Sequence, residues 1–166
     1  MSRHTLQIEP LTREAFAPFG DVIECSDSNE LLPINYGRTE RHHALAAVEV
    51  GEGRAILNIF RSKPVQDGFA LRVIERHPLG SQAFMPLSPY PYAVVVAPPG
   101  DFDPTALRAF LASPAQGVNY HAGTWHHYCL ALEGESDFLV VDREGPGDNC
   151  DEIQLTGDYT LKIERS

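Results

Sequence analysis

Short apolar runs, separated by glycine and proline, follow one another through most of the chain. The runs are rich in Val, Ile, Leu, Phe and Tyr, and turn residues recur between them at short intervals. We expect strands at residues 54–60, 69–75, 82–87, 92–97, 128–132 and 138–142. Regular short strands with turn signals between them are typical of an all-β sandwich or barrel.

Two segments instead predict short helices. Residues 12–16 begin with Thr12, a good N-cap, and residues 103–111 begin with Asp103 followed by Pro104 at the first helical position. No repeat, low-complexity segment or linker interrupts the pattern, so we expect a single domain over residues 1–166.

Strand alternation brings polar residues onto an apolar face. Along residues 69–77 one face would carry Phe69, Leu71, Val73, Glu75 and His77. A stripe of this kind predicts a barrel interior with a polar mouth. The same rule places His126 on one face with Tyr128, Leu130 and Leu132. If both faces look inward, Glu75, His77 and His126 converge although they are distant in sequence.

The segment Gly117–His127 is unusually dense in imidazole. It holds His121, His126 and His127 together with Tyr120 and the only tryptophan, Trp125. Histidine titrates near neutrality and is the commonest metal ligand, so this segment is the predicted active site. His127 alternates away from His126, and we expect it at the surface or at an interface.

Composition and charge limit the partners. Hydrophobic residues make up 43% of the chain and charged residues 22%, as in ordinary soluble domains. The net charge of −10 argues against nucleic acid and against an anionic membrane surface, because both need clustered Lys and Arg. An acidic protein can still bind an acidic small molecule through a few focused arginines.

The cysteines and the apolar runs indicate a reducing compartment. Cys25, Cys129 and Cys150 are odd in number and widely spaced, which favours neither a disulfide framework nor a structural zinc site. The first residues lack the apolar core of a signal peptide, and the longest apolar run, residues 92–97, is far too short for a membrane span. We therefore expect a cytoplasmic protein.

Two spacings resemble the metal-binding signatures of cupin barrels, His-x-His-x(3,4)-Glu and Pro-x-Gly-x-x-His. This chain reads Glu75-x-His77-x4-Gln82 and then His121-x-Gly123-x-x-His126, with the same spacing and altered residue types. Glu75, His77, Gln82 and His126 could hold a divalent ion with open positions. The alternatives are an ion pair for Glu75 and hydrogen-bonded core positions for the two histidines.

Arginines are candidates for binding a carboxylate, which their planar fork matches. Arg61 ends an apolar strand on the face of Leu57 and Ile59, so it would reach the barrel rim, or else lie solvated at the strand end. Arg41 is the second candidate. Arg76 alternates away from Glu75 and His77, which favours a surface or dimer contact.

At this point a family resemblance becomes specific. Residues 75–84, residues 117–121 with 125–127, and residues 137–143 with 148–151 resemble ureidoglycolate lyase, with weaker similarity at 19–23 and 35–42. The resemblance implies a cupin-like (jelly-roll type) β-barrel, a homodimer, and cleavage of (S)-ureidoglycolate to glyoxylate and urea in allantoin (purine) catabolism. It also implies a possible nickel ion, since some members depend on nickel.

The residues suit this chemistry. The reacting carbon of ureidoglycolate carries a carboxylate, a hydroxyl and a ureido nitrogen, so cleavage needs a base for the hydroxyl and an acid for the nitrogen. We expect Glu75 to act as ligand or general base and Tyr120 or His121 as the acid. His77, Gln82 and His126 would hold a metal or a substrate oxygen.

The substrate pocket would be completed by Arg41 or Arg61 at the carboxylate, and by Asn119 and Trp125.

Two other functions remain open at this point. Another cupin enzyme, such as a sugar or keto-acid isomerase, would share the barrel and its polar mouth. A non-catalytic ligand-binding cupin would bind ureidoglycolate without releasing urea.

Overall fold

The computed structural model describes residues 2–163, and strands dominate it. The strands are β1 (Arg3–Pro10), β2 (Gly20–Ile23), β3 (Leu31–Ile34), β4 (Thr39–His42), β5 (Arg54–Ser62), β6 (Phe69–Arg76), β7 (Gln82–Pro86), β8 (Tyr92–Ala97), β9 (Arg108–Ala112), β10 (Gly117–Tyr120), β11 (Trp125–His126), β12 (Leu130–Ala131), β13 (Ser136–Glu144) and β14 (Asp151–Lys162). The helical elements are α1 (Arg13–Phe16) and two 3₁₀ turns, η1 (Asn35–Gly37) and η2 (Pro104–Ala106). The predicted all-β, cupin-like class is confirmed.

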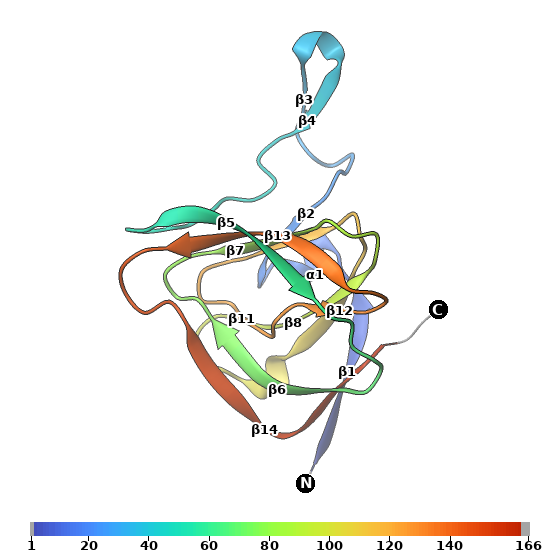
Figure 1. Ribbon diagram of the computed structural model, residues 1–166, viewed down its shortest axis with the longest axis vertical. Coiled ribbons are helices and arrows are strands. Elements are labelled where there is room, and N and C mark those ends of the chain that lie inside the picture. Colours follow the sequence, from blue (N-terminus) through green and yellow to red (C-terminus); the bar gives the residue numbers. More distant parts are fainter. Residues whose placement is uncertain (1, 164–166) are drawn as a thin grey trace.

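Six strands close into a barrel (Figure 1). Their order is β11-β6-β14-β1-β9-β8, and β11 pairs with β8 as well as with β6, which completes the ring. The first strand, β1, runs parallel to both of its neighbours, whereas the other pairs in the ring are antiparallel. Closure of this kind leaves the ring without exposed strand edges.

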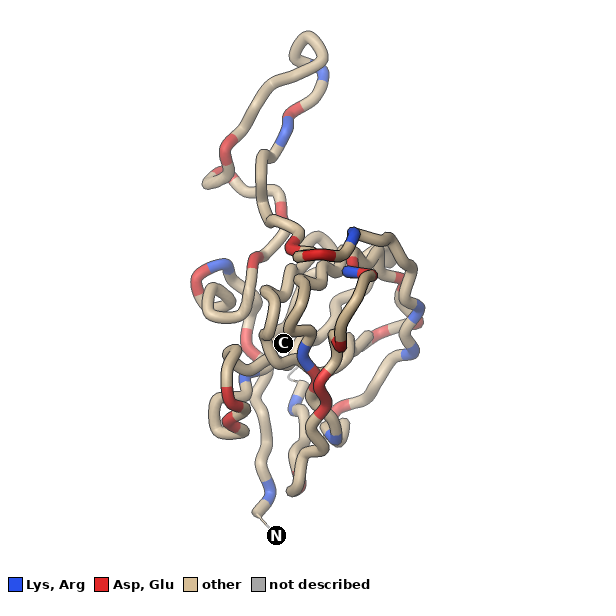
Figure 2. The backbone as a smooth tube through the Cα atoms, turned by 90° about the vertical axis from the view of Figure 1, so that its left-hand side faces the viewer, with Lys and Arg blue, Asp and Glu red and all other residues tan. Residues whose placement is uncertain are grey.

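A five-stranded antiparallel sheet, in the order β2-β10-β7-β13-β5, covers one side of the barrel. Between β2 and β5 the chain leaves this sheet to form a separate hairpin of β3 and β4. We call residues 31–42 the arm. The arm rises on the side of the sheet away from the barrel, and its tip stands clear of the body (Figures 1 and 2).

Two apolar cores share one wall of strands. The first fills the barrel and takes side chains from all six of its strands, among them Leu71, Val95 and Leu161. The second lies between the barrel and the five-stranded sheet, where Val94 and Phe110 of the barrel meet Phe138 of the sheet. Strands β8 and β9 contribute to both cores because alternate side chains point to opposite faces.

The helix predicted over residues 103–111 is wrong beyond its first turn. The Asp103 side chain does accept a hydrogen bond from the Thr105 backbone N–H, but the turn ends at Ala106, and β9 begins at Arg108. Strand β9 lies between β1 and β8, so its backbone groups are paired on both sides. That ladder, together with burial of Phe110, outweighs the helical preference of the segment. The helix predicted at Thr12 is confirmed as α1.

The predicted face of β6 is also wrong in part. Leu71 and Ile74 both point into the barrel, although strict alternation would separate them. The shift coincides with an irregularity, because the pairing with β14 jumps from Gln154 to Tyr159. Glu75, next to Ile74, therefore lies on the wall of the barrel that faces the five-stranded sheet.

The strand predicted at residues 128–132 is broken. It is replaced by β11 and β12, with residues 127–129 irregular between them. Trp125 and Leu130 point into the barrel, whereas His126 stacks on Tyr120 in the other core. His127, expected at the surface, is buried.

The remaining sequence expectations concern cysteines and membrane spans. Cys25, Cys129 and Cys150 are free thiols in the structure. Within residues 2–163, no helix combines the length and the apolar character that crossing a bilayer requires.

We predict that Phe138→Ala lowers the free energy of unfolding by about 3–5 kcal/mol, because it opens a cavity in the core between barrel and sheet. The Phe138 ring is fully buried and makes edge contacts with Tyr92 and Phe84. Phe60 lies directly opposite it in the ladder but is exposed, so Phe60→Ala is the matched control. Urea denaturation measures both variants, and equal losses would contradict this account of the core.

Candidate active site

Three side chains with metal-binding atoms converge between the barrel and the sheet. The ligand atoms of Glu75, His77 and His126 all lie within 4.8 Å of one another. Glu75 is near the end of β6, His77 follows that strand directly, and His126 is directly opposite Glu75 in the pairing of β11 with β6. The predicted convergence of these residues is confirmed, and we refer to them as the triad.

Backbone carbonyls fix the two imidazole rings. The Nδ1 of His77 donates to the Asn149 carbonyl at 2.8 Å, and the Nδ1 of His126 donates to the His127 carbonyl at 3.3 Å. In each ring the proton on Nδ1 leaves a lone pair on Nε2. Both Nε2 atoms are buried and have no hydrogen-bond partner. A metal-binding histidine usually donates one ring N–H to a carbonyl or carboxylate and binds the metal through its other nitrogen.

Burial keeps His126 neutral. Desolvation, with a smaller contribution from the neighbouring His77, lowers the pKa of His126 to about 3. Metals bind the neutral imidazole, so His126 needs no deprotonation near pH 7. The ring stacks on Tyr120, with centroids 4.4 Å apart and planes 9° apart. Burial raises the pKa of the Tyr120 hydroxyl well above its usual value, so this group keeps its proton.

Gln82 reaches the layer between barrel and sheet from the side of the five-stranded sheet. It starts β7 and lies directly across the ladder from Tyr120, so the two side chains share a face. Its Nε2 donates to a carboxylate oxygen of Asp142 at 2.8 Å, which leaves its Oε1 buried without a partner. The two imidazole nitrogens and the carboxylate of the triad suit a divalent transition metal, and the Gln82 Oε1 is a candidate for a further oxygen ligand.

The surface around Cys150 and Glu75, which we call the mouth of the site, is acidic. The Cys150 thiol lies 3.7 Å from a carboxylate oxygen of Glu75. Partial burial, followed by the negative charges of Glu75 and Glu152, raises the pKa of that thiol. Sequence reasoning did not identify Cys150, Asn149 or Asp142 as neighbours of the site. The sequence signal that could have identified them is the block of family resemblance at residues 137–143 with 148–151, which contains all three.

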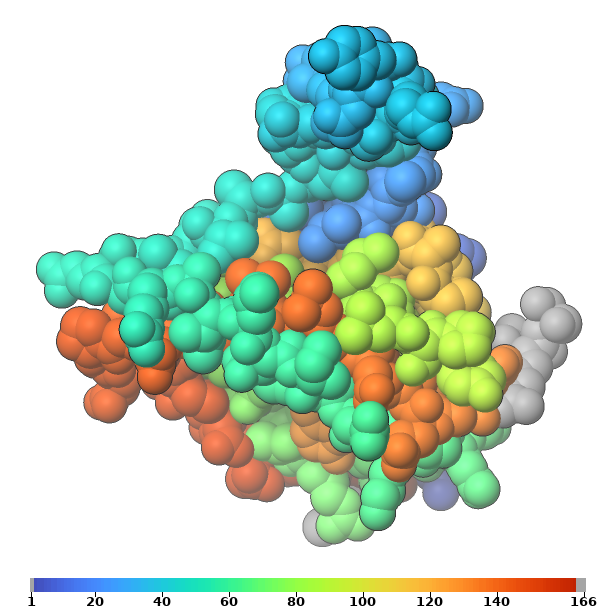
Figure 3. All heavy atoms as spheres, turned by 45° about the horizontal axis from the view of Figure 1, so that its top comes forward, coloured from blue at the N-terminus to red at the C-terminus, as the bar shows by residue number. Residues whose placement is uncertain are grey.

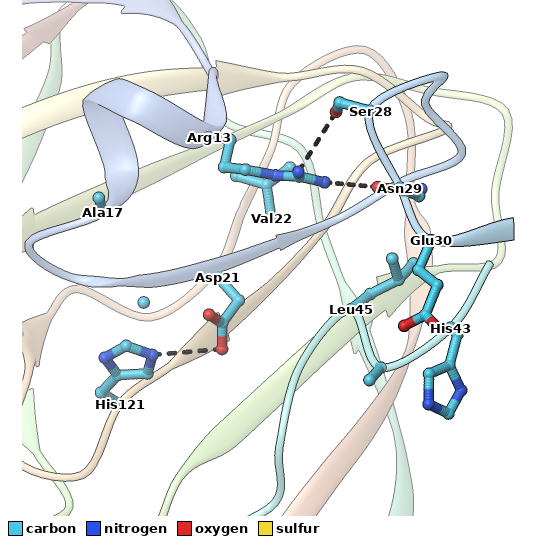
Figure 4. Close-up of a pocket in the computed structure, with 12 residues that line it drawn as sticks. Arg13, Ala17, Asp21, Val22, Ser28, Asn29, Glu30, His43, Leu45 and His121 are labelled. Carbon is cyan, nitrogen blue, oxygen red and sulfur yellow. Dashed lines mark hydrogen bonds and ion pairs between the residues drawn. The ribbon is translucent and has the colours of Figure 1, made fainter.

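Asn119 and His121, both predicted for the active site, lie elsewhere. Asn119 neighbours Tyr120 on β10, so its side chain points through the other face of the sheet, where it donates to Asp21 and to the Ala47 carbonyl. His121 is 3.2 Å from the same Asp21 carboxylate (Figure 4). His121 and Asp21 line a separate hollow of about 470 Å³ at the base of the arm.

Trp125 does not reach the triad either. It precedes His126 on β11, so alternation turns its ring into the barrel, where its Nε1 donates to the Gly100 carbonyl at 2.9 Å. Arg76 lies over that ring at 4.5 Å and donates to Asp151 at 2.8 Å. Trp125 and Arg76 therefore make their contacts on the barrel side of the wall, away from the triad.

The two arginines predicted for the carboxylate are also remote from the triad. Arg61 lies on the outer face of the sheet with exposed Leu57 and Ile59, so its predicted position at the rim is wrong. Its guanidinium binds the Asp137 carboxylate at 2.8 and 3.1 Å. Arg41 is exposed on the arm.

Comparison with known proteins points to one family. The family model described as Ureidoglycolate lyase matches residues 3–162. A protein named Ureidoglycolate lyase from Burkholderia mallei (strain NCTC 10229) is 55% identical over 167 residues, covering 96% of this chain and 98% of its own. Proteins of the same name from Pseudomonas aeruginosa (strain LESB58) and Stutzerimonas stutzeri (strain A1501) are 54% and 53% identical over 163 residues; they cover 96% of this chain, and 96% and 95% of their own.

We predict that metal-free protein loses stability in acid because of His126. Below pH 6.5 the unfolded chain protonates this residue, whereas the folded protein excludes the proton down to about pH 3. The unfolded state then binds more protons than the folded state. The free energy of unfolding therefore decreases as the pH is lowered, by up to about 1.4 kcal/mol per pH unit from this residue. Urea denaturation in EDTA between pH 7 and 5 measures this slope.

His126→Gln is the comparison, since glutamine fills the site without titrating. The variant should show a shallower pH dependence than the wild-type protein. Identical slopes would mean that His126 is not kept neutral by burial.

Proposed function

The chain belongs to the ureidoglycolate lyase family, and we propose that it cleaves (S)-ureidoglycolate to glyoxylate and urea at the triad. The observation that carries this assignment is the convergence of Glu75, His77 and His126, in which the Nε2 atoms of both histidines are buried without a hydrogen-bond partner. We further propose that residues 1–166 act as one catalytic domain, in the cytoplasm, within allantoin catabolism.

The reaction is an elimination that moves one proton. The C–N bond breaks, the hydroxyl on the same carbon becomes the aldehyde oxygen of glyoxylate, and the nitrogen leaves as urea. The hydroxyl must lose its proton while the nitrogen gains one, so the enzyme needs a base and an acid on the two sides of that carbon.

Glu75 and Tyr120 fit these two roles. Glu75 is the only carboxylate of the triad and is half-buried, and we assign it as the group that accepts the hydroxyl proton. Tyr120 keeps its proton because of burial, and it stacks beside His126, from where its hydroxyl can supply the departing nitrogen. His121, the other predicted acid, contacts Asp21 in a different hollow.

The triad and Gln82 fit a divalent metal ion, and we propose nickel. His77 and His126 would hold it through Nε2, with oxygen from Glu75 and Gln82. When bound, such an ion acts as a Lewis acid that lowers the pKa of a coordinated hydroxyl and orients the carboxylate. The protein contributes a rigid donor set, since the carbonyls of Asn149 and His127 hold the rings of His77 and His126 in place.

We also propose that the protein is a homodimer. The outer face of the five-stranded sheet exposes Leu57 and Ile59, and the arm exposes Ile34 and Tyr36. Apolar side chains in such number are characteristic of surfaces that meet another protein.

We predict that purified enzyme releases urea and glyoxylate from (S)-ureidoglycolate, that EDTA abolishes the activity and that nickel restores it. His126→Ala should lower kcat at least about 100-fold, because it removes one donor of the site and the stacking partner of Tyr120. Coupled assays for both products measure turnover, and circular dichroism checks the fold.

His4→Ala is the matched control, because His4 is an exposed histidine that stacks on Tyr159 outside the site. It should leave turnover unchanged. Near-normal turnover in His126→Ala would remove that residue from the mechanism. Turnover that resists EDTA would support the proposed lyase activity and contradict the proposed need for a metal.

A further inference from the structure

The arm is an exposed hairpin with no support from the body at its tip. Tyr36 is completely exposed, and Leu31 and Ile34 are each more than a third exposed. Figure 3 shows the arm as a knob that stands on the rest of the molecule. A lone two-stranded hairpin is only marginally stable in water, so this one gains stability if its apolar side chains are covered.

The arm also carries unpaired arginines. Among the arginines of residues 2–163, only Arg38, Arg41 and Arg72 have no hydrogen-bond or ion-pair partner for the side chain, and two of these belong to the arm. Arg41 lies opposite Leu32 in the β3–β4 ladder, on the face away from the ion pair of Glu40 and His42. One face of the arm therefore combines apolar side chains with a free guanidinium, and Figure 2 shows these basic positions far from the body.

Among residues 2–163, no arginine side chain forms a hydrogen bond or ion pair with the triad. Beside the proposed metal ion, the site therefore has no guanidinium of its own chain to bind the carboxylate of ureidoglycolate. Arg76, the arginine next to the triad in sequence, is held on the barrel side by Asp151. In a chain of net charge −10, with Glu75 and Glu152 near the Cys150 thiol, a guanidinium in addition to the proposed metal ion would strengthen the binding of an anion.

The arm cannot supply that group to its own site, because the five-stranded sheet separates them. The triad lies between sheet and barrel, because His126 stacks on Tyr120 of the core there. The arm leaves the sheet on the side away from the barrel (Figure 1). A second copy of the chain provides what each copy lacks. In a two-fold dimer the same contact forms twice, so that two arms serve two sites.

We propose that the arm of one protomer docks at the mouth of its partner's active site, and that Arg41 there binds the carboxylate of the substrate. The inference rests on the proposed lyase function and on the dimer. Charge complementarity between the basic arm and the acidic mouth favours a second copy as the occupant. Ile34 and Tyr36 would supply the apolar part of the contact.

Arg41→Ala tests the contact with the substrate. We expect kcat/KM to fall by about 10- to 100-fold, mainly through a higher KM, because a charge-assisted hydrogen bond to the carboxylate is lost. Arg72→Ala is the matched control, since Arg72 is an exposed and unpaired arginine of β6 outside the arm. Unchanged kinetics in Arg41→Ala, or equal losses in both variants, would overturn the proposal.

A hybrid dimer shows whether Arg41 acts across the interface. Arg41→Ala and His126→Ala chains are co-expressed with different affinity tags, and the dimers that carry both tags are purified. If the arm acts in trans, one of the two sites combines an intact triad with an intact arm, so the hybrid has about half of the wild-type activity. If Arg41 acts within its own chain, both sites are damaged and the hybrid is no better than the two parent variants.

Sedimentation equilibrium separates failure of this inference from failure of the proposed function. The wild-type protein should sediment as a dimer, and the variant Ile34→Asp/Tyr36→Asp should shift to monomer with an unchanged circular dichroism spectrum. A dimer that is insensitive to this variant would overturn docking through the arm, whatever the activity. Absence of ureidoglycolate cleavage by the wild-type enzyme, with dimerisation still dependent on the arm, would instead refute the lyase assignment and the carboxylate role of Arg41.

Discussion

The pairing of β11 between β6 and β8 is the constraint on which the rest of the structure depends. The two residues of β11 close the barrel, and their side chains point to opposite faces of the barrel wall. Trp125 points into the barrel, and His126 points toward the five-stranded sheet. Because His126 pairs directly with Glu75, closing the ring also assembles the triad. Fold and site are therefore fixed by one set of backbone hydrogen bonds.

The triad is costly to the folded protein unless something binds there. Buried polar atoms without partners cost free energy, and the Nε2 atoms of His77 and His126 and the Oε1 of Gln82 all lack partners. The structure tolerates this because Nδ1 of each ring is anchored to a backbone carbonyl. A protein evolved only for stability would fill this position with apolar side chains, so the open lone pairs indicate a function.

The arm extends the same reasoning to the surface. The body satisfies almost all of its arginines internally, as with Arg61 on Asp137 and Arg76 on Asp151, and leaves its active site acidic. The free positive charge is concentrated instead on a hairpin that projects beyond the sheet. Dividing anion recognition and catalysis between two protomers would link activity to assembly, because neither copy then holds a complete site.

Local alternation and motif spacing were enough to predict the all-β class, most strand positions and the meeting of Glu75, His77 and His126. The face on which each side chain lies could not be predicted in this way, because it depends on how the strands pair. An irregularity in β14 shifts the alternation in β6, a break after His126 buries His127, and pairing on both sides turns residues 108–112 from helix into strand. Likewise, Arg61 and His121 lie away from the triad because their strand faces and carboxylate partners are tertiary facts. Local sequence sets the period of a strand, but long-range pairing sets its phase.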